Sequence, residues 1–255
     1  MRQEHPSWAR LRQYNLAASG LHAAQAAAVI VFANTFFLPV RASYMTGPPG
    51  PDVATQTVTL FDVRFAWAIA AFFILSAVAH FLIAGPMWHS YERQLARCRN
   101  PYRWLEYSLS ASIMIVLIAM LVGIEDVAAL VALVGVNAAM IGFGWIQERY
   151  ESPGTGLGPF WLGCLAGIVP WAAIGIYLAG PGTALHPPAF VYAIFGSLFV
   201  AFNCFAVNQW LQYREVGRWS SYVVGERAYV TLSLVAKSLL AWQIFAATLA
   251  SGAAH

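Results

Sequence analysis

The chain has 255 residues, of which 60% are hydrophobic and only 10% are charged. Soluble domains carry about 25% charged residues, so this composition indicates a membrane protein and argues against a soluble globular one. The net charge is +3 and the arginines are not gathered on one segment, which argues against nucleic acid as a partner. The spacing of Cys98, Cys164 and Cys204 predicts neither a disulfide framework nor a zinc site.

Seven apolar segments are each long enough to cross a bilayer, which takes about 20 helical residues. We therefore predict an all-α membrane protein, a bundle of seven transmembrane helices that forms a single domain over residues 1–255. The first segment is too long for a signal-peptide core and is read as the first span. The predicted spans cover residues 15–38, 64–88, 102–124, 127–147, 159–179, 189–213 and 227–250.

The connections between these spans are short except for the first, near residues 41–63. This loop contains the turn-forming run Gly-Pro-Pro-Gly-Pro at residues 47–51, followed by a β-branched stretch at residues 55–60 that is typical of a strand. We expect a small β-hairpin on the membrane surface.

The basic residues predict the orientation of the bundle. One side of the membrane would hold eleven arginines and the other only two, Arg41 and Arg64. Because the richer side is normally cytoplasmic, we expect a multi-pass protein of the cell membrane with its N-terminus in the cytoplasm and residues 251–255 outside. The eleven are Arg2, Arg10, Arg12, Arg93, Arg97, Arg99, Arg103, Arg149, Arg214, Arg218 and Arg227.

Lys237 is the only lysine of the chain, and it lies ten residues into the last predicted span. That is about 15 Å from the helix start, near the bilayer centre. A charge at that depth costs about 2.5–3.5 kcal/mol on the most lenient scale, so it needs a partner or a purpose. Two readings remain open: a buried ion pair that fixes helix packing, or a reactive amine that condenses with an aldehyde.

Glu106 is the only carboxylate that the sequence places clearly inside a span. It falls in the cytoplasmic half, and other polar residues of the spans fall at the same depth. Each alone is compatible with ordinary packing, but together they predict a polar pocket beside Lys237. These residues are His22, Gln25, Ser76, His80 and Ser233.

Residues 233–242 read SLVAKSLLAW around the lysine, and Glu106 is followed by Tyr107 and Ser108. With His22 and His80 in the first two spans and an N-terminus inside, the whole chain resembles the heliorhodopsin family of microbial rhodopsins. The long first loop is similar as well.

The resemblance implies that Lys237 binds all-trans retinal as a Schiff base, with Glu106 as the sole carboxylate counterion. Ser233 would stand where ordinary pumps carry a second aspartate. The Schiff-base cavity would be lined by His22, Gln25, Ser76, His80 and Tyr107. Residues expected along the polyene and ring, for which interhelical packing is the alternative, are Asn137, Ile141, Trp161 and Phe202.

The resemblance further implies a homodimer in the lipid bilayer that acts as a light sensor or signalling protein, not an enzyme, with a signalling partner of unknown identity. Ordinary proton pumps carry two carboxylates three turns apart on the third helix. Here the position eleven residues after Glu106 is Leu117, which cannot carry a proton. We therefore expect all-trans to 13-cis isomerisation and internal proton transfer without net ion pumping.

Three other readings compete with this one. The first is a light-driven ion transporter. The second is a transporter without chromophore that uses the Lys237–Glu106 pair as a gate. The third is a membrane-embedded metalloenzyme, which the spacing of the histidines and the glutamate disfavours because it matches no zinc signature.

Overall fold

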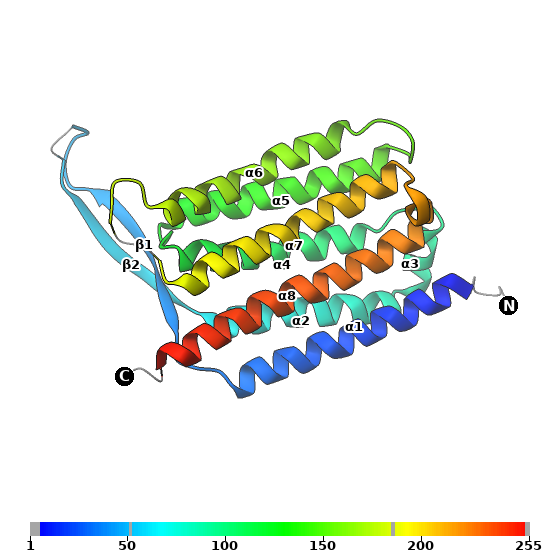
Figure 1. The fold of residues 1–255 in the computed structure, drawn as a ribbon, viewed down its shortest axis with the longest axis horizontal. Coiled ribbons are helices and arrows are strands. Elements are labelled where there is room, and N and C mark those ends of the chain that lie inside the picture. Colours follow the sequence, from blue (N-terminus) through cyan, green and yellow to red (C-terminus); the bar gives the residue numbers. More distant parts are fainter. Residues whose placement is uncertain (1–5, 51–52, 185–186, 253–255) are drawn as a thin grey trace.

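The computed structural model describes residues 6–50, 53–184 and 187–252. Seven long helices run side by side and confirm the predicted seven-helix bundle (Figure 1). Arg2, one of the eleven arginines of the predicted cytoplasmic side, and residues 253–255 of the predicted external end lie outside the described residues. The long helices are α1 (Pro6–Val31), α2 (Phe65–Ala84), α4 (Pro101–Leu121), α5 (Val127–Tyr150), α6 (Gly158–Ala179), α7 (Ala189–Tyr213) and α8 (Tyr222–Gly252).

Six of these helices are long and apolar enough to cross a membrane by themselves, within the described part of the chain. The exception is α1, which is 26 residues long but carries Arg10, Arg12 and Asn15 in its first half. It packs along α2 and α8, and α4 packs between α2 and α5. These contacts make α1 the seventh member of the bundle.

The predicted hairpin is present and longer than expected. Strands β1 (Phe37–Met45) and β2 (Thr55–Arg64) pair antiparallel and project beyond the helix ends (Figure 1). The predicted end of the first helix was wrong. The helix stops at Val31 and not at residue 38, because Phe37 already pairs with Arg64 in the hairpin. The hairpin base is tied to the bundle where Arg41 forms a salt bridge of 2.9 Å with Glu125.

Three other boundaries differ from the prediction. The second span ends at Ala84, and the polar chain after it forms a separate short helix, α3 (Trp88–Leu95), which was not predicted. The last span starts at Tyr222 and not at residue 227, after a 3-10 turn, η1 (Gly217–Ser220). Likewise α5 continues to Tyr150, three residues beyond the prediction. Each extension brings a glutamate into a helix, with consequences for the site.

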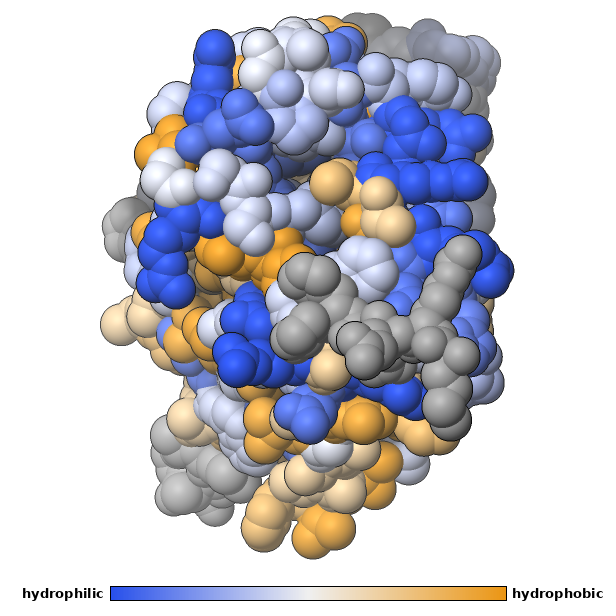
Figure 2. All heavy atoms as spheres, turned by 90° about the vertical axis from the view of Figure 1, so that its right-hand side faces the viewer, coloured by the Kyte–Doolittle hydropathy of each residue, from blue (hydrophilic) through white to orange (hydrophobic). Residues whose placement is uncertain are grey.

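The bundle has an apolar half and a polar half along its length. The main hydrophobic core joins side chains of α2, α4, α7 and α8 toward the hairpin end, including Phe73, Leu117, Leu198, Leu240 and Phe245. The opposite end carries α3, η1 and most of the exposed arginines, and it presents a largely hydrophilic surface (Figure 2). The polar residues predicted inside the bundle therefore lie in the half nearer this arginine-rich end.

Candidate functional site

Lys237 lies in the middle of α8 with its side chain pointing into the bundle, and only 3% of its surface is exposed. Its ammonium group donates a hydrogen bond of 2.7 Å to Ser233, one helical turn earlier. It also lies 3.2 Å from a carboxylate oxygen of Glu106 on α4. The structure therefore brings together the three residues that the sequence placed at one depth.

Glu106 is held in place by a second helix. The hydroxyl of Ser76 on α2 donates a hydrogen bond of 2.6 Å to the same carboxylate oxygen that faces Lys237. Glu106 is 8% exposed and Ser76 is fully buried. A charge pair in such surroundings is stable only when its remaining hydrogen-bonding capacity is satisfied, and Ser76 contributes to that.

The two histidines form the side of the cluster that faces α1 and α2. Their rings stack with centroids 5.6 Å apart, and His80 shares a hydrogen bond of 2.7 Å with Asn15. Both ring nitrogens of His22 are buried without a hydrogen-bond partner among the described residues. A buried imidazole in this state keeps its donor and acceptor capacity free.

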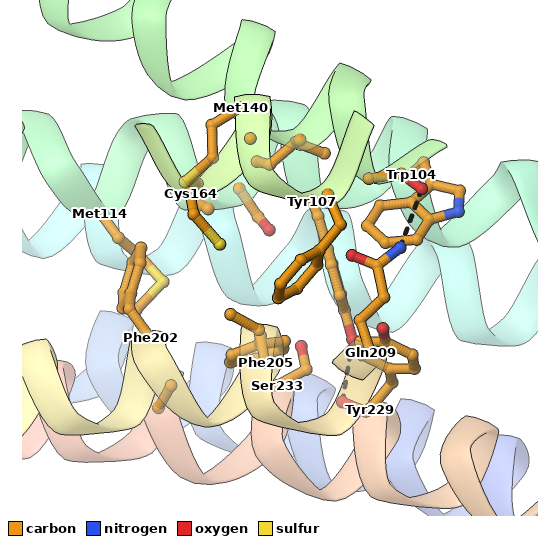
Figure 3. Close-up of a pocket in the computed structure, with 18 of the residues that line it drawn as sticks. Trp104, Tyr107, Met114, Met140, Cys164, Phe202, Phe205, Gln209, Tyr229 and Ser233 are labelled. Atoms are coloured by element: carbon orange, nitrogen blue, oxygen red, sulfur yellow. Dashed lines mark hydrogen bonds between the residues drawn. The ribbon is translucent and has the colours of Figure 1, made fainter. Parts of the chain in front are cut away.

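Beside this cluster lies a narrow apolar cavity of about 130 Å³, walled by α4, α5, α6, α7 and α8 (Figure 3). Lys237 and Ser233 contribute its polar edge. Tyr107 lies across one side and fixes its ring by donating a hydrogen bond of 2.8 Å to the carbonyl of Tyr229. The other labelled lining residues in Figure 3 are Trp104, Met114, Met140, Cys164, Phe202, Phe205 and Gln209.

Of the four residues expected along the polyene and ring, Ile141 and Phe202 line this cavity. The prediction for Trp161 was wrong, because 58% of its surface is exposed. Its ring packs on Phe160, and Phe160 lines the cavity instead. The two are adjacent on α6, so an error of one residue, about 100° on a helix, exchanges inside for outside. Asn137 is buried, but its amide donates to Ser112 and does not line the cavity.

Gln25 also does not join the polar cluster. Its amide oxygen accepts a hydrogen bond of 3.2 Å from Trp242 at a partly exposed position between α1 and α8. It lies almost one turn beyond His22, toward the apolar half of the bundle. The prediction that it lines the cavity was therefore wrong, because its depth was judged without the rotation of the helix.

Sequence reasoning missed the small residues that create the cavity. A Cβ atom at Gly144 on α5 would lie 2.6 Å from the ring of Trp104. Gly163 on α6 is similarly close to α5, where a Cβ would meet Phe143 at 3.2 Å. Both glycines line the cavity. Small residues are common where membrane helices cross closely. The glycines of the fourth and fifth predicted spans were therefore the sequence signal for close helix packing at this cavity.

The structure also corrects the count of buried carboxylates. Glu148 and Glu226 are 5% and 1% exposed and flank Arg103, so Glu106 is not the only buried acid. Arg103 forms salt bridges with both, to Glu148 at 2.5 Å and to Glu226. The predicted spans ended at residue 147 and began again at residue 227, so Glu148 and Glu226 fell just outside them, whereas α5 and α8 include both.

A seven-helix bundle with a buried lysine in its last helix, facing a carboxylate and an apolar cavity, has the architecture of a microbial rhodopsin. A solved structure of this class, a light-driven proton pump, LR (Mac) from Leptosphaeria maculans, matches with a TM-score of 0.56. The match covers 97% of this chain and 96% of that chain at 12% sequence identity, so it shows a common fold alone. No curated protein sequence matches this chain significantly.

The sequence profile of the heliorhodopsin family matches residues 11–249. The chain belongs to the heliorhodopsin family. It is therefore a multi-pass membrane protein of the retinal rhodopsin type, as the motif around Lys237 predicted.

Proposed function

We propose that this protein is a light sensor that carries all-trans retinal on Lys237 and moves a proton internally without net ion transport. The observation that carries the proposal is the position of Lys237: it joins an apolar cavity on one side to a one-sided polar cluster on the other. The orientation with the N-terminus in the cytoplasm is part of the proposal and is supported by the unequal distribution of arginines.

The cavity fits a conjugated polyene because its wall is almost entirely carbon and sulfur, supplied by Met114, Met140, Phe202 and Phe205 among others. The amine at its edge fits an aldehyde, since a desolvated lysine is a nucleophile that forms imines with carbonyl compounds. Bound there, retinal would supply light absorption and photoisomerisation about its 13–14 double bond. Lys237 would hold it, and Tyr107 and Ile141 would pack along it.

The residues around Lys237 have separate tasks. Glu106 balances the positive charge at the Nζ atom across 3.2 Å, and Ser76 keeps that carboxylate oriented. Ser233 accepts the hydrogen bond from Nζ and so defines the direction in which its proton points. His80 lines a small cavity together with Glu106, and His22 stacks on His80, so this pair can exchange a proton with the cluster.

One-sidedness is the reason to propose sensing and not pumping. Net transport needs a proton acceptor on one side of Lys237 and a donor on the other. Toward the hairpin end, the core contains apolar side chains such as Leu117, Leu240 and Ile244, and polar ones such as Ser112 and Gln243 that cannot ionise. Glu125 and Asp126 lie at the far helix end, where Glu125 pairs with Arg41 and Asp126 caps α5. Neither is placed to reload Lys237.

Absorption spectroscopy tests the chromophore. Protein purified from membranes supplied with all-trans retinal should absorb visible light, whereas Lys237→Ala should be colourless although it still folds. Ser238→Ala is a matched control on the same helix, because its hydroxyl donates only to the carbonyl of Leu234. If wild-type protein stays colourless with retinal, the transporter reading, in which Lys237 and Glu106 form a gate, replaces this one.

Vesicles test the absence of transport. Illuminated vesicles that contain the coloured protein should show no sustained change of internal pH. A steady light-driven pH change that a protonophore abolishes would overturn the sensor proposal. The protein would then be a light-driven ion transporter.

A further inference from the structure

The polar half of the bundle contains a second buried charge cluster that the proposed photochemistry has not used. It consists of Arg103 on α4, Glu148 on α5 and Glu226 on α8, and we name it the Arg103 triad. The guanidinium group also lies against two rings, 3.9 Å from the centroid of Tyr229 and 4.6 Å from that of Trp104. Its Nε atom is buried without a hydrogen-bond partner among the described residues.

Two further cavities meet at this triad. A small cavity of about 30 Å³ is lined by both Glu106 and Glu226, together with His80, Arg103 and Tyr107. A larger polar cavity of about 330 Å³ lies on the other side of Arg103 and is lined by Glu148 but not by Glu226. Since a water needs roughly 10–15 Å³ of such space, the small cavity has room for about two waters between Glu106 and Glu226.

The interior holds more negative than positive groups. Among the described residues, the buried cations are Lys237 and Arg103, and the buried carboxylates are Glu106, Glu148 and Glu226. Glu106 is paired with Lys237, which leaves two carboxylates on one guanidinium. Two carboxylates that share a site cannot both remain ionised as easily as one, so the triad has a place for one proton.

The hydrogen bonds decide which of the two carboxylates takes that proton. Glu148 accepts from the backbone of Asn100 at 2.8 Å, from Trp104 at 2.6 Å and from Tyr222 at 2.9 Å, besides pairing with Arg103. These donors stabilise its ionised form.

Glu226 has fewer donors. Asn100 donates to it at 2.7 Å, Tyr91 donates across a longer 3.3 Å, and its other oxygen meets only Arg103. Protonation therefore sacrifices less at Glu226 than at Glu148, and Glu226 alone of the two lines the small cavity with Glu106. The titratable and charged groups that contact Glu226 or line the small cavity with it are His80, Tyr91, Tyr102, Arg103, Glu106 and Tyr107. Through Arg103 the cluster continues to Glu148 and Tyr229, and Tyr222 donates to Glu148.

We propose that Glu226 is the internal acceptor of the proton that leaves Lys237 after illumination. The N–H bond at Nζ breaks and an O–H bond forms at the Glu226 carboxylate, with the proton relayed past Glu106 through the small cavity. One positive and one negative charge disappear together, so the net charge of the interior does not change. Arg103 stays paired with Glu148 and separates the acceptor from the larger cavity. The proton then returns to Nζ along the same route.

This proposal rests on the proposed function, because it needs a light-dependent release from Lys237. Infrared difference spectroscopy on the coloured protein tests it. Light should produce a carbonyl band of a protonated carboxyl group. That band should vanish in Glu226→Gln, persist in Glu148→Gln, and return at a shifted frequency in Glu226→Asp, which keeps the carboxyl group on a shorter side chain.

A second readout needs no chromophore. In the retinal-free protein, acidification from neutral pH should first protonate one carboxyl group, and Glu226→Gln should remove that step while Glu148→Gln keeps it. A light-induced carboxyl band that survives unchanged in Glu226→Gln, or is lost in Glu148→Gln instead, would overturn the assignment. Absence of any visible pigment in the wild type would instead count against the proposed function, so the two failures are distinguishable.

Discussion

At the scale of single residues, Lys237 and Glu106 are defined by their environment more than by their chemical type. Both are almost fully buried, and their separation of 3.2 Å allows each to offset the cost of burying the other. Removing one partner of such a pair leaves an uncompensated buried charge. The two residues should therefore respond strongly to substitution, with loss of colour at Lys237 and a shift of colour at Glu106.

We expect Glu106→Gln to keep a pigment but to move its absorption to longer wavelength. The carboxylate stabilises a positive charge localised near Nζ, and its loss lowers the energy needed to shift that charge along the polyene. Acidification of the wild type should produce the same direction of change, since it protonates the same carboxylate. Glu125→Gln, at the exposed loop beside Arg41, should leave the spectrum unchanged in a parallel measurement.

At the scale of helices, close packing of α4 against α5 forms one wall of the cavity. Gly144 permits this approach, and Trp104 cannot yield because its indole nitrogen donates to Glu148 at 2.6 Å. The same two helices, with α8, are joined by the Arg103 triad. The contact between Gly144 and Trp104 and the Arg103 triad therefore lie on the same helix interface, and each can be perturbed by its own substitution.

Gly144→Ala should lower the free energy of unfolding by about 1–3 kcal/mol, the usual cost of overpacking, and reduce the yield of pigment. Gly142→Ala on the same helix is the control, because its Cβ would meet no atom within 4 Å. Denaturant titration followed by loss of colour measures both. Equal stability of the two variants would contradict the account of Gly144 as a contact glycine.

Arg103→Met should lower the free energy of unfolding by about 3–5 kcal/mol, because it leaves two buried carboxylates without a cation. Replacing all three groups together, as in Arg103→Met with Glu148→Leu and Glu226→Leu, should recover much of that loss, since no charge is then buried alone. Thermal bleaching of the pigment compares the two. If the triple variant is less stable than the single one, the triad contributes net stabilisation beyond mutual compensation.

At the scale of the whole molecule, the bundle has two unlike ends. The hairpin projects from one, and most exposed arginines surround the other (Figure 1; Figure 2). The arginine-rich end is expected to face the cytoplasm. The homodimer and the signalling partner that the family resemblance implies stay predictions, because one chain alone does not test them.

The orientation can be measured with a membrane-impermeant maleimide, in a variant whose Cys164 and Cys204 are replaced by alanine. In intact cells, Gly50→Cys at the hairpin tip should be labelled and Cys98 at the opposite end should not. Burial, and to a lesser degree the Glu148 carboxylate, raise the pKa of the Cys98 thiol. Its labelling in permeabilised cells should therefore be slow at neutral pH and accelerate as the pH rises. Labelling of Cys98 in intact cells would contradict the proposed orientation.

The sequence by itself determined the bundle, the hairpin and the central residue, because these follow from local properties. The length of apolar segments, the turn residues at 47–51 and a single lysine inside an apolar run can be read along one dimension. Depth along a helix, at 1.5 Å per residue, brought Ser76, Glu106 and Ser233 to the level of Lys237 without any knowledge of helix contacts.

Only the tertiary structure decided which way each side chain faces. Rotation about the helix axis separated Phe160 in the cavity from Trp161 outside it, and it took Gln25 out of the cluster. The Arg103 triad was hidden for a second reason: its members lie on three helices, each near a boundary that hydropathy places poorly. A buried charge is tolerated only where its partners converge in space, and that convergence is a property of the packed bundle.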